Sequence, residues 1–512
     1  MKTNRRDFLG NTALGSVAVM INNSNIVFAH GTTQNSELEE TTVAELQSAM
    51  QSGIMSSREI TKKYLERIKE IDPKLKSVIE TNPDALKIAE DLDKERKKGK
   101  VRGALHGIPV LIKDNIETRD KMKTTAGSLA LVNAPTPKQD AFLVTQLRKS
   151  GAIILGKTNL SEWANFRSTK STSGWSGRGG QTNNPYILDK NPCGSSSGSG
   201  AAISANLAVV GIGTETNGSI ICPAVTCGIV GLKPTLGLVS RSGVIPIAHS
   251  QDTAGPMTRT VADAAILLGV LVGTDKTDAI TSQSAKGEKD YTKFLDKNGL
   301  RGARIGVARQ YFGRNEKRNK IYESHLQVLK DGGATLIDVT FTTAKDFGSD
   351  QTAILLYEFK AGLNKYLAQR NSPYKTLYDL IKFNEENKDR EMPLFGQELF
   401  LQAQEKGDLE TREYRLALQK LKLATQANGI DAVIAKDNLD AIFSPTSGAA
   451  WGQAAVAGYP NITVPAGFVD EMPIGVSFLG RAFSEPALIK FAYAFEQATK
   501  MRQPPKFLPT LK

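Results

Sequence analysis

Short apolar runs that alternate with helical patterns constrain the fold of this chain more than any other feature. Ile108–Ile112 and Ala152–Leu155 have the length and composition of buried strands, and Asp140–Ser150 between them has the pattern of a helix. Similar apolar runs return near the C-terminus at Ala441–Thr446 and Ile474–Leu479. Buried strands that alternate with helices are typical of layered α/β proteins. We therefore predict an α/β fold with a largely buried sheet.

The alternating pattern continues without an internal repeat or a Pro-rich linker, so we predict a single domain over residues 30–512. With 40% hydrophobic and 23% charged residues, the 512-residue chain has the composition of an ordinary globular protein. Residues 280–440 are charged and mostly helical in pattern, as at Glu413–Asn428. We expect this helix-rich part to be a peripheral cover that shapes a cleft.

The first residues resemble an export signal. Asn4–Leu9 contains paired arginines followed by Phe-Leu, and the apolar segment Ala13–Ile21 and a small residue at Ala29 follow in the expected order. We predict that residues 1–29 are a twin-arginine signal peptide and that the protein is exported to the periplasm. The alternative is a frayed basic tail. No later run reaches the roughly 18 apolar residues that a membrane span needs, so we expect no integral membrane contact.

The formal net charge is +12, and the densest basic run is Lys94–Lys100. No aromatic residues are interleaved in this run, so we interpret it as a solvated helix end and expect no nucleic-acid partner. The cysteine and histidine spacings contain neither CxxC nor HExxH, and we therefore expect no metal site. The chain has three clustered cysteines, Cys193, Cys222 and Cys227. Because their number is odd and they are clustered, we do not interpret them as a disulfide framework.

Two loops rich in small hydroxyl residues, Cys193–Gly200 and Gly213–Ile220, carry the strongest functional signal. The apolar run Leu207–Ile212 between them is unlike a flexible linker. A catalytic serine needs a base, and the oxyanion that it creates needs fixed N–H donors. The turn Thr216-Asn217-Gly218-Ser219 offers both a hydroxyl and N–H groups, and Asn and Gly tolerate the positive φ that such turns require. The plainer alternative is a structural turn or helix cap.

Lys113 is the candidate base, because no histidine is near either loop in the sequence. It ends an apolar strand, where desolvation would lower its pKa toward neutrality. Ser195 could bridge Lys113 to Ser219 and pass the proton along. The alternative is a surface pair of Lys113 with Asp114 at the end of a strand.

Eight segments together resemble the amidase signature family, over about residues 40 to 505. They are Gly107–Asn115, Gly156–Glu162, Arg178–Pro185, Cys193–Gly200, Gly213–Ile220, Gly231–Pro234, Asp252–Arg259 and Ala457–Pro465. The resemblance implies a large mixed twisted β-sheet that helices cover on both faces. It also implies a Ser-cis-Ser-Lys triad, in which Ser219 is the nucleophile, Ser195 is the bridging serine after a cis peptide bond and Lys113 is the base. The backbone N–H groups of Thr216, Asn217, Gly218 and Ser219 would form the oxyanion hole.

The family resemblance implies a serine amidohydrolase that releases ammonia through an acyl-enzyme and needs no metal or organic cofactor. Cys193 stands where the family has a glycine. Because the residue is small we expect it to be tolerated, and its thiol could be sensitive to oxidation. Ile221 replaces an arginine, which argues against small acidic amides. The segments Thr214–Pro223 and Phe395–Glu398 resemble the peptide-amidase-like branch. The implied substrate is therefore a small-molecule or peptide amide, including the C-terminal amides of peptides.

Three other functions remain open at this point. A glutamyl-tRNA amidotransferase A-type transamidase subunit would share the same triad, although an export signal disfavours it. A Ser-His-Asp hydrolase could use the GxSxG match at residues 194–198 with His249 or His325, but Asn191–Cys193 does not read as the preceding strand. A non-catalytic ligand-binding protein could use Gly211-Ile-Gly213 as a dinucleotide loop, although Thr216 stands where the third glycine belongs.

Overall fold

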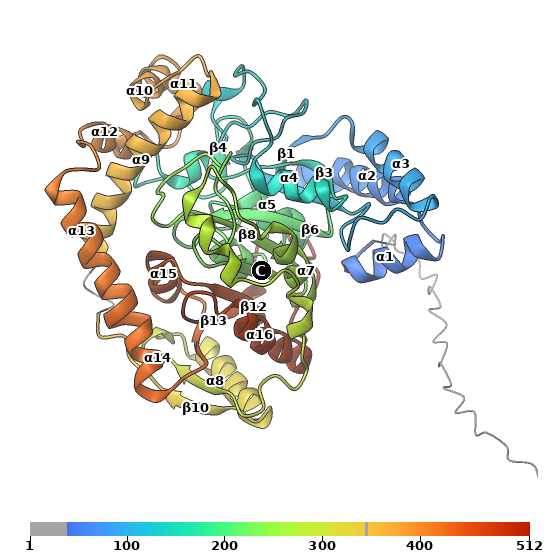
Figure 1. Ribbon diagram of the computed structural model, residues 1–512, viewed down its shortest axis with the longest axis vertical. Coiled ribbons are helices and arrows are strands. Elements are labelled where there is room, and N and C mark those ends of the chain that lie inside the picture. Colours follow the sequence, from blue (N-terminus) through green and yellow to red (C-terminus); the bar gives the residue numbers. More distant parts are fainter. Residues whose placement is uncertain (1–37, 344–346, 512) are drawn as a thin grey trace, which may run out of the picture. The chain divides into compact units, whose positions relative to one another are not determined.

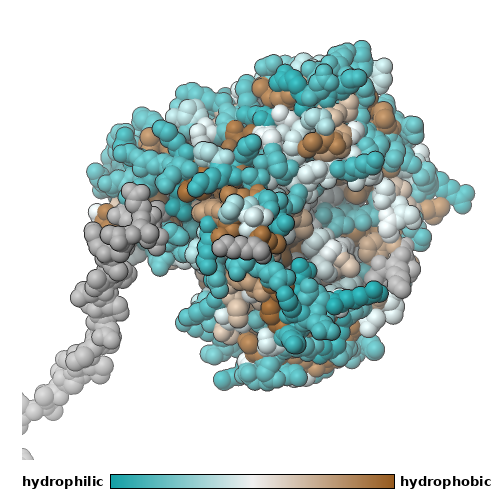
Figure 2. Space-filling view, turned by 180° about the vertical axis from the view of Figure 1, so that it is seen from behind, coloured by the Kyte–Doolittle hydropathy of each residue, from teal (hydrophilic) through white to brown (hydrophobic). Residues whose placement is uncertain are grey.

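The computed structural model describes residues 38–343 and 347–511 (Figure 1), and these belong to one compact unit that begins at Leu38. The signal peptide predicted for residues 1–29 lies outside the described residues. Within the described ranges, no helix is long and apolar enough to cross a membrane. Figure 2 shows one face of the molecule, on which hydrophilic residues predominate.

An 11-stranded sheet runs through the unit in the order β1-β3-β2-β6-β8-β7-β12-β13-β11-β9-β10. The strands are β1 (Val78–Thr81), β2 (Pro109–Lys113), β3 (Ile153–Thr158), β6 (Val210–Glu215), β7 (Val230–Lys233), β8 (Thr253–Thr258), β9 (Arg304–Val307), β10 (Thr335–Asp338), β11 (Ala441–Pro445), β12 (Asn461–Val469) and β13 (Met472–Leu479). β2 is parallel to both β3 and β6, whereas β6 is antiparallel to β8. The sheet is therefore mixed, and the predicted α/β fold is confirmed. A separate small sheet pairs β4 (Trp175–Ser176) with β5 (Gly180–Gln181).

Helices flank the sheet (Figure 1). They are α1 (Val43–Gln51), α2 (Ser57–Leu75), α3 (Ala85–Lys97), α4 (Phe142–Lys149), α5 (Ser197–Ser204), α6 (Ile221–Thr226), α7 (Val261–Leu271), α8 (Glu316–Asp331), α9 (Gly348–Arg370), α10 (Leu377–Glu386), α11 (Lys388–Glu391), α12 (Glu398–Gln404), α13 (Arg412–Lys422), α14 (Asp431–Asp437), α15 (Gly448–Ala457) and α16 (Glu485–Thr499). α5 packs on β2, β3 and β6, and α7 packs on β8. The apolar, fully buried strands β2 and β3 need this cover, because neither of their faces reaches water.

The part from 280 to 440, which the sequence predicts to be a helix-rich peripheral cover, contains strands as well as helices. It is mostly helical, and α9, α12 and α13 pack together in it (orange tones in Figure 1). However, it also supplies β9 and β10, which pair in parallel and form one edge of the sheet next to β11. Each of these strands has only four residues, and the ends of β10 are exposed, so the sequence pattern is too short and too polar to reveal them.

Candidate active site

Lys113 lies at the end of β2, and its side chain is fully buried. Its Nζ lies 2.8 Å from Ser195 Oγ and 2.9 Å from Thr214 Oγ1, with the carbonyl oxygen of Thr214 at 3.3 Å. The neighbouring Asp114 is also fully buried and accepts hydrogen bonds from Thr125 and Arg178 instead. The alternative of a surface Lys113–Asp114 pair is therefore wrong.

Burial lowers the pKa of Lys113 to about 7, while the carboxylates of Asp252 and Glu215 act in the opposite direction. The apolar strand that carries the lysine into the interior is the cause of this shift. A lysine with such a pKa is largely neutral in mildly alkaline solution, and a neutral amine can accept a proton.

Ser195 and Ser219 come from different segments that meet in space. The peptide bond between Gly194 and Ser195 is cis, as the family resemblance implies. The backbone N–H of Ser196 donates to the carbonyl oxygen of Ser219 at 3.1 Å, which joins the two segments directly. Both serines line one cavity, whose other lining residues include Asn115, Thr214, Thr216 and Asp252. The structure therefore brings Lys113, Ser195 and Ser219 into one site.

The turn from Thr216 to Ser219 follows β6 directly. Gly218 has φ of 81°, and the Trp451 ring occupies the place where its Cβ would be, so only glycine fits here. The positive φ falls on Gly218 alone and not on Asn217. Within the part of the chain that the structure describes, the N–H groups of Thr216, Asn217, Gly218 and Ser219 donate to no protein acceptor. Two of these four residues, Thr216 and Ser219, also line the cavity of the serines.

Two contacts of the site were not anticipated from the sequence. Thr214 supplies two acceptors to Lys113, and its hydroxyl also accepts a hydrogen bond from Asn115 Nδ2 at 3.0 Å. Asn115 is buried and lines the cavity, and its Oδ1 has no hydrogen-bond partner among the described residues. Asn115 follows the predicted base by two positions, which is the one signal in the sequence that could have pointed to it.

Asp252 is a third unanticipated neighbour of the site. It accepts hydrogen bonds from the Thr216 hydroxyl at 2.5 Å and from the N–H groups of Ile247 and Ala248 at 2.8 Å each. Burial raises the pKa of Asp252 to about 6, although these hydrogen bonds favour its ionised form. Asp252 therefore fixes the turn that starts at Thr216 and adds a negative charge near Lys113 above about pH 6.

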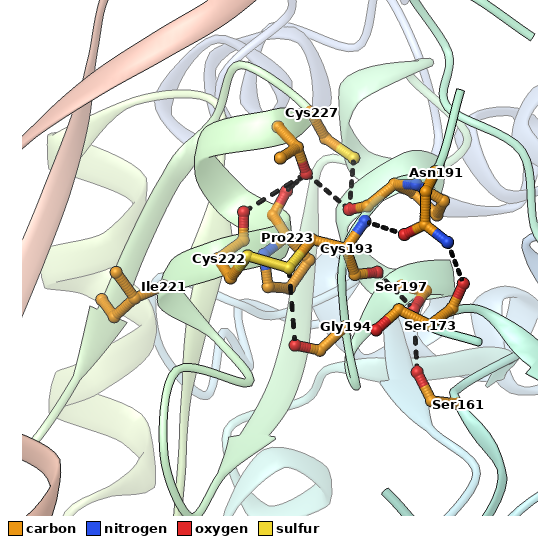
Figure 3. Close-up of a disulfide and its surroundings, with 12 residues drawn as sticks. Ser161, Ser173, Asn191, Cys193, Gly194, Ser197, Ile221, Cys222, Pro223 and Cys227 are labelled. Carbon is orange, nitrogen blue, oxygen red and sulfur yellow. Dashed lines mark hydrogen bonds between the residues drawn. A yellow bond between two sulfur atoms is a disulfide. The ribbon is translucent and has the colours of Figure 1, made fainter. Parts of the chain in front are cut away.

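The expectation that the cysteines form no disulfide is wrong. Cys193 and Cys222 are joined by a disulfide, so Cys193 is not the free thiol that the sequence indicated (Figure 3). Among the described cysteines only Cys227 is free, and it is buried. The two bonded residues are 29 positions apart, and only the meeting of the two serine-bearing segments brings them together.

The rival constellations do not form. Of the described histidines, none lines the cavity of Ser195 and Ser219. His249 faces Glu358, and His325 contacts the carbonyl oxygen of Ala466. Gly211 lies inside β6 and not in a dinucleotide-binding loop. No group of three or more His, Cys, Asp or Glu side chains that could hold a metal ion occurs in residues 38–343 and 347–511.

Comparisons with known proteins agree on one family. A family model described as Amidase matches residues 59–455. A protein of Arabidopsis thaliana named a probable amidase is 44% identical over 92% of both chains. The crystal structure of native peptide amidase from Stenotrophomonas maltophilia has a TM-score of 0.88 and 48% identity, and the match covers 92% of this chain and 99% of that one. The A-type subunit of the glutamyl-tRNA(Gln) amidotransferase of Thermoanaerobacter pseudethanolicus is 37% identical, over 92% of this chain and 99% of its own.

Proposed function

The chain belongs to the amidase signature family, and from this premise we propose that it is a serine amidohydrolase with Ser219 as its nucleophile. The observation that carries the proposal is the buried contact of Lys113 Nζ with Ser195 Oγ, in a cavity that Ser219 also lines. Lys113 differs from other buried lysines such as Lys157 in that its amine contacts a serine hydroxyl of this cavity, where it can take part in proton transfer.

The contacts of Lys113 support its role as the base. A neutral amine has two N–H bonds and one lone pair. The hydroxyl and carbonyl oxygens of Thr214 can accept both N–H bonds, which leaves the lone pair for the hydroxyl proton of Ser195. Ser195 in turn would take the proton of Ser219 as Ser219 attacks the amide carbon.

The remaining steps use the turn that follows β6. The oxyanion would be bound by the N–H groups of Thr216 to Ser219, which have no protein acceptor among the described residues. Collapse of the tetrahedral intermediate returns the proton from Lys113 through Ser195 to the departing nitrogen, which leaves as ammonia. Water, activated by the same pair, then hydrolyses the ester of Ser219 and regenerates the enzyme.

Two structural observations and one comparison support peptide C-terminal amides as the substrates. The unpartnered Oδ1 of Asn115 is an acceptor in the catalytic cavity, and the NH₂ group of a primary amide is a matching donor. An outer cleft shares the lining residues Arg241, Val244 and Asp252 with the cavity, and this neighbouring space would suit a long acyl chain. The 48% identity to a peptide amidase points to the same substrate class.

Ammonia release from a panel of primary amides tests the substrate class. The panel contains aliphatic amides, aromatic amides and C-terminally amidated dipeptides. The corresponding peptide anilides serve as substituted amides, and their cleavage is followed by the release of aniline. We expect the highest kcat/KM for the amidated dipeptides. Faster cleavage of the anilides would contradict the proposed recognition of an NH₂ group by Asn115.

Transamidation is a second candidate function, because the chain is 37% identical to the A-type subunit of a glutamyl-tRNA(Gln) amidotransferase. That reaction passes ammonia to an activated glutamyl-tRNA and needs partner chains, whereas hydrolysis needs none. Ammonia release from amidated dipeptides by the isolated chain favours hydrolysis. Release that occurs only with partner chains and glutamyl-tRNA favours transamidation.

We also propose that the protein is exported to the periplasm by the twin-arginine motif at Arg5 and Arg6. The disulfide between Cys193 and Cys222 supports this, because disulfides persist mainly in oxidising compartments. Cell fractionation of the wild type and of an Arg5→Lys/Arg6→Lys variant tests it. Retention of the wild type in the cytoplasm would contradict export.

A further inference from the structure

The disulfide joins the two segments that carry the proposed catalytic serines (Figure 3). Cys193 lies two residues before Ser195, and Cys222 lies three residues after Ser219 in the first turn of α6. We infer that this bond is a positioning element that holds Ser219 and its turn in register with Ser195, so that its reduction lowers turnover. The inference rests on the proposed function.

On one side, the backbone of Cys222 contacts the turn from Thr216 to Ser219 directly. Its N–H donates to the carbonyl oxygen of Gly218 at 2.7 Å. Gly218 in turn lies against the ring of Trp451, with no room for a Cβ between them. The turn is thus held between Trp451 and the start of α6, and a displacement of Cys222 moves the N–H groups that would bind the oxyanion.

On the other side, Cys193 is connected to Ser195 through Gly194 alone. The N–H of Cys193 donates to Asn191 Oδ1 at 2.8 Å, and its carbonyl oxygen accepts from Ser197 Oγ at 2.6 Å. These bonds fix the segment locally but do not fix it against α6. Because only Gly194 separates the two residues, a displacement of Cys193 also displaces Ser195.

Several hydrogen bonds would still join the segments after reduction, among them two between Ser196 Oγ and the backbone of Thr214. Ser196 N–H donates to the carbonyl oxygen of Ser219 at 3.1 Å, and Thr226 Oγ1 donates to the carbonyl oxygen of Pro192. These contacts keep the segments adjacent, so we expect reduction to loosen their register and not to unfold the site. The loss should then appear in kcat, because the binding cleft outside the two segments is unchanged.

Thiol–disulfide exchange can reach this bond. Both Cys193 and Cys222 are partly exposed, so a dithiol can attack one of the two sulfurs. The first thiolate of the dithiol breaks the S–S bond and forms a mixed disulfide, and its second thiol resolves it. The products are two protein thiols and the oxidised dithiol, a transfer of two electrons. Burial raises the pKa of Cys227 to about 12, so this thiol stays protonated and does not exchange.

The test measures kcat and KM for ammonia release from an amidated dipeptide by the full chain. The oxidised protein is compared with protein reduced by dithiothreitol and with protein reoxidised by oxidised glutathione. We expect reduction to lower kcat by about tenfold or more, since small misplacements of reacting groups cost up to about a hundredfold. KM should stay within about twofold, and reoxidation should restore kcat.

Cysteine variants distinguish the effect of losing the disulfide from any other effect of dithiothreitol on the enzyme. A Cys193→Ser/Cys222→Ser enzyme should have the kcat of the reduced wild type and no response to dithiothreitol. Cys193→Gly removes the same bond, and glycine accommodates the φ of 59° at this position, so it serves where the double variant fails to fold. Cys227→Ser is the matched control and should behave as the wild type in both redox states.

If the disulfide were a purely structural cross-link, its reduction would lower Tm but leave kcat unchanged at temperatures well below Tm. Equal kcat in the oxidised and reduced wild type would therefore overturn the inference, while Ser219-dependent ammonia release would still support the proposed function. Absence of Ser219-dependent release from the oxidised wild type would overturn both.

Discussion

The side-chain nitrogen of Lys113 lies 2.8 Å from the hydroxyl oxygen of Ser195, a residue 82 positions further along the chain. The contact forms because β2, which ends at Lys113, pairs in parallel with β6, and the segment of Ser195 packs beside both strands. Thr214 of β6 occupies the remaining hydrogen-bonding capacity of the amine. This arrangement directs the free electron pair of a neutral Lys113 at Ser195.

Replacement of the amine should abolish turnover and preserve the fold. Lys113→Met keeps the length of the side chain and removes the buried nitrogen, so we expect kcat to fall by roughly 10³-fold or more with little change in Tm. Lys157 is the matched control, because it is equally buried in the adjacent β3 but contacts Ile116 and Thr124 outside the cavity. Steady-state ammonia release and thermal unfolding measure both variants. A larger loss of kcat in Lys157→Met than in Lys113→Met would contradict the assignment.

The rate of hydrolysis should rise with pH through the titration of Lys113. The pKa of this residue is lowered to about 7 by burial, and only its neutral form can accept a proton. Below that pH the lysine is protonated and kcat/KM should fall about tenfold per pH unit, whereas above it kcat/KM should level off. A pH profile of kcat/KM checks this. A decrease of kcat/KM between pH 6 and 8 would have the wrong sign for a lysine base.

The negative charge of Asp252 should set the pH at which kcat/KM begins to fall on the acid side of the profile (the acid limb). The carboxylate raises the pKa of Lys113, so Asp252→Asn should move the limb to lower pH while the amide retains the hydrogen bonds to Ile247 and Ala248. Asp263→Asn is the control, because Asp263 is a buried carboxylate bonded to the N–H of Val43 and remote from the cavity. The acid limb of the Asp263→Asn variant should stay at the pH of the wild type. A shift of the Asp252→Asn limb to higher pH would refute the coupling.

The hydroxyl of Thr214 should matter for the orientation of the amine. Thr214→Val removes an acceptor of both Lys113 and Asn115 with almost no change in shape, and we expect kcat to fall by about tenfold. Thr214→Ser retains the hydroxyl and should keep kcat within about twofold. The two variants are compared at saturating amidated dipeptide. Equal activity of the two would show that the backbone carbonyl of Thr214 suffices.

The local elements and the site segments could be predicted from the sequence, whereas the contacts between them could not. Ile108–Ile112 and Ala152–Leu155 have strong local patterns, and the structure confirms strands there. The pairing of Cys193 with Cys222 depends on how two loops meet, so spacing alone pointed to the wrong conclusion.

The same limit applies to the neighbours of Lys113. Thr214 and Asn115 meet through the register of β2 against β6, which no single-strand pattern contains. Strands β9 and β10 were missed because four residues are too few for a reliable period.

Ammonia release from a C-terminally amidated dipeptide by the purified chain and by its Ser219→Ala variant tests the central claim most directly. The account predicts steady release by the wild type and a loss of roughly 10³-fold or more in the variant, with the same Tm for both proteins. Equal rates from the two proteins would contradict the assignment of Ser219 as the nucleophile.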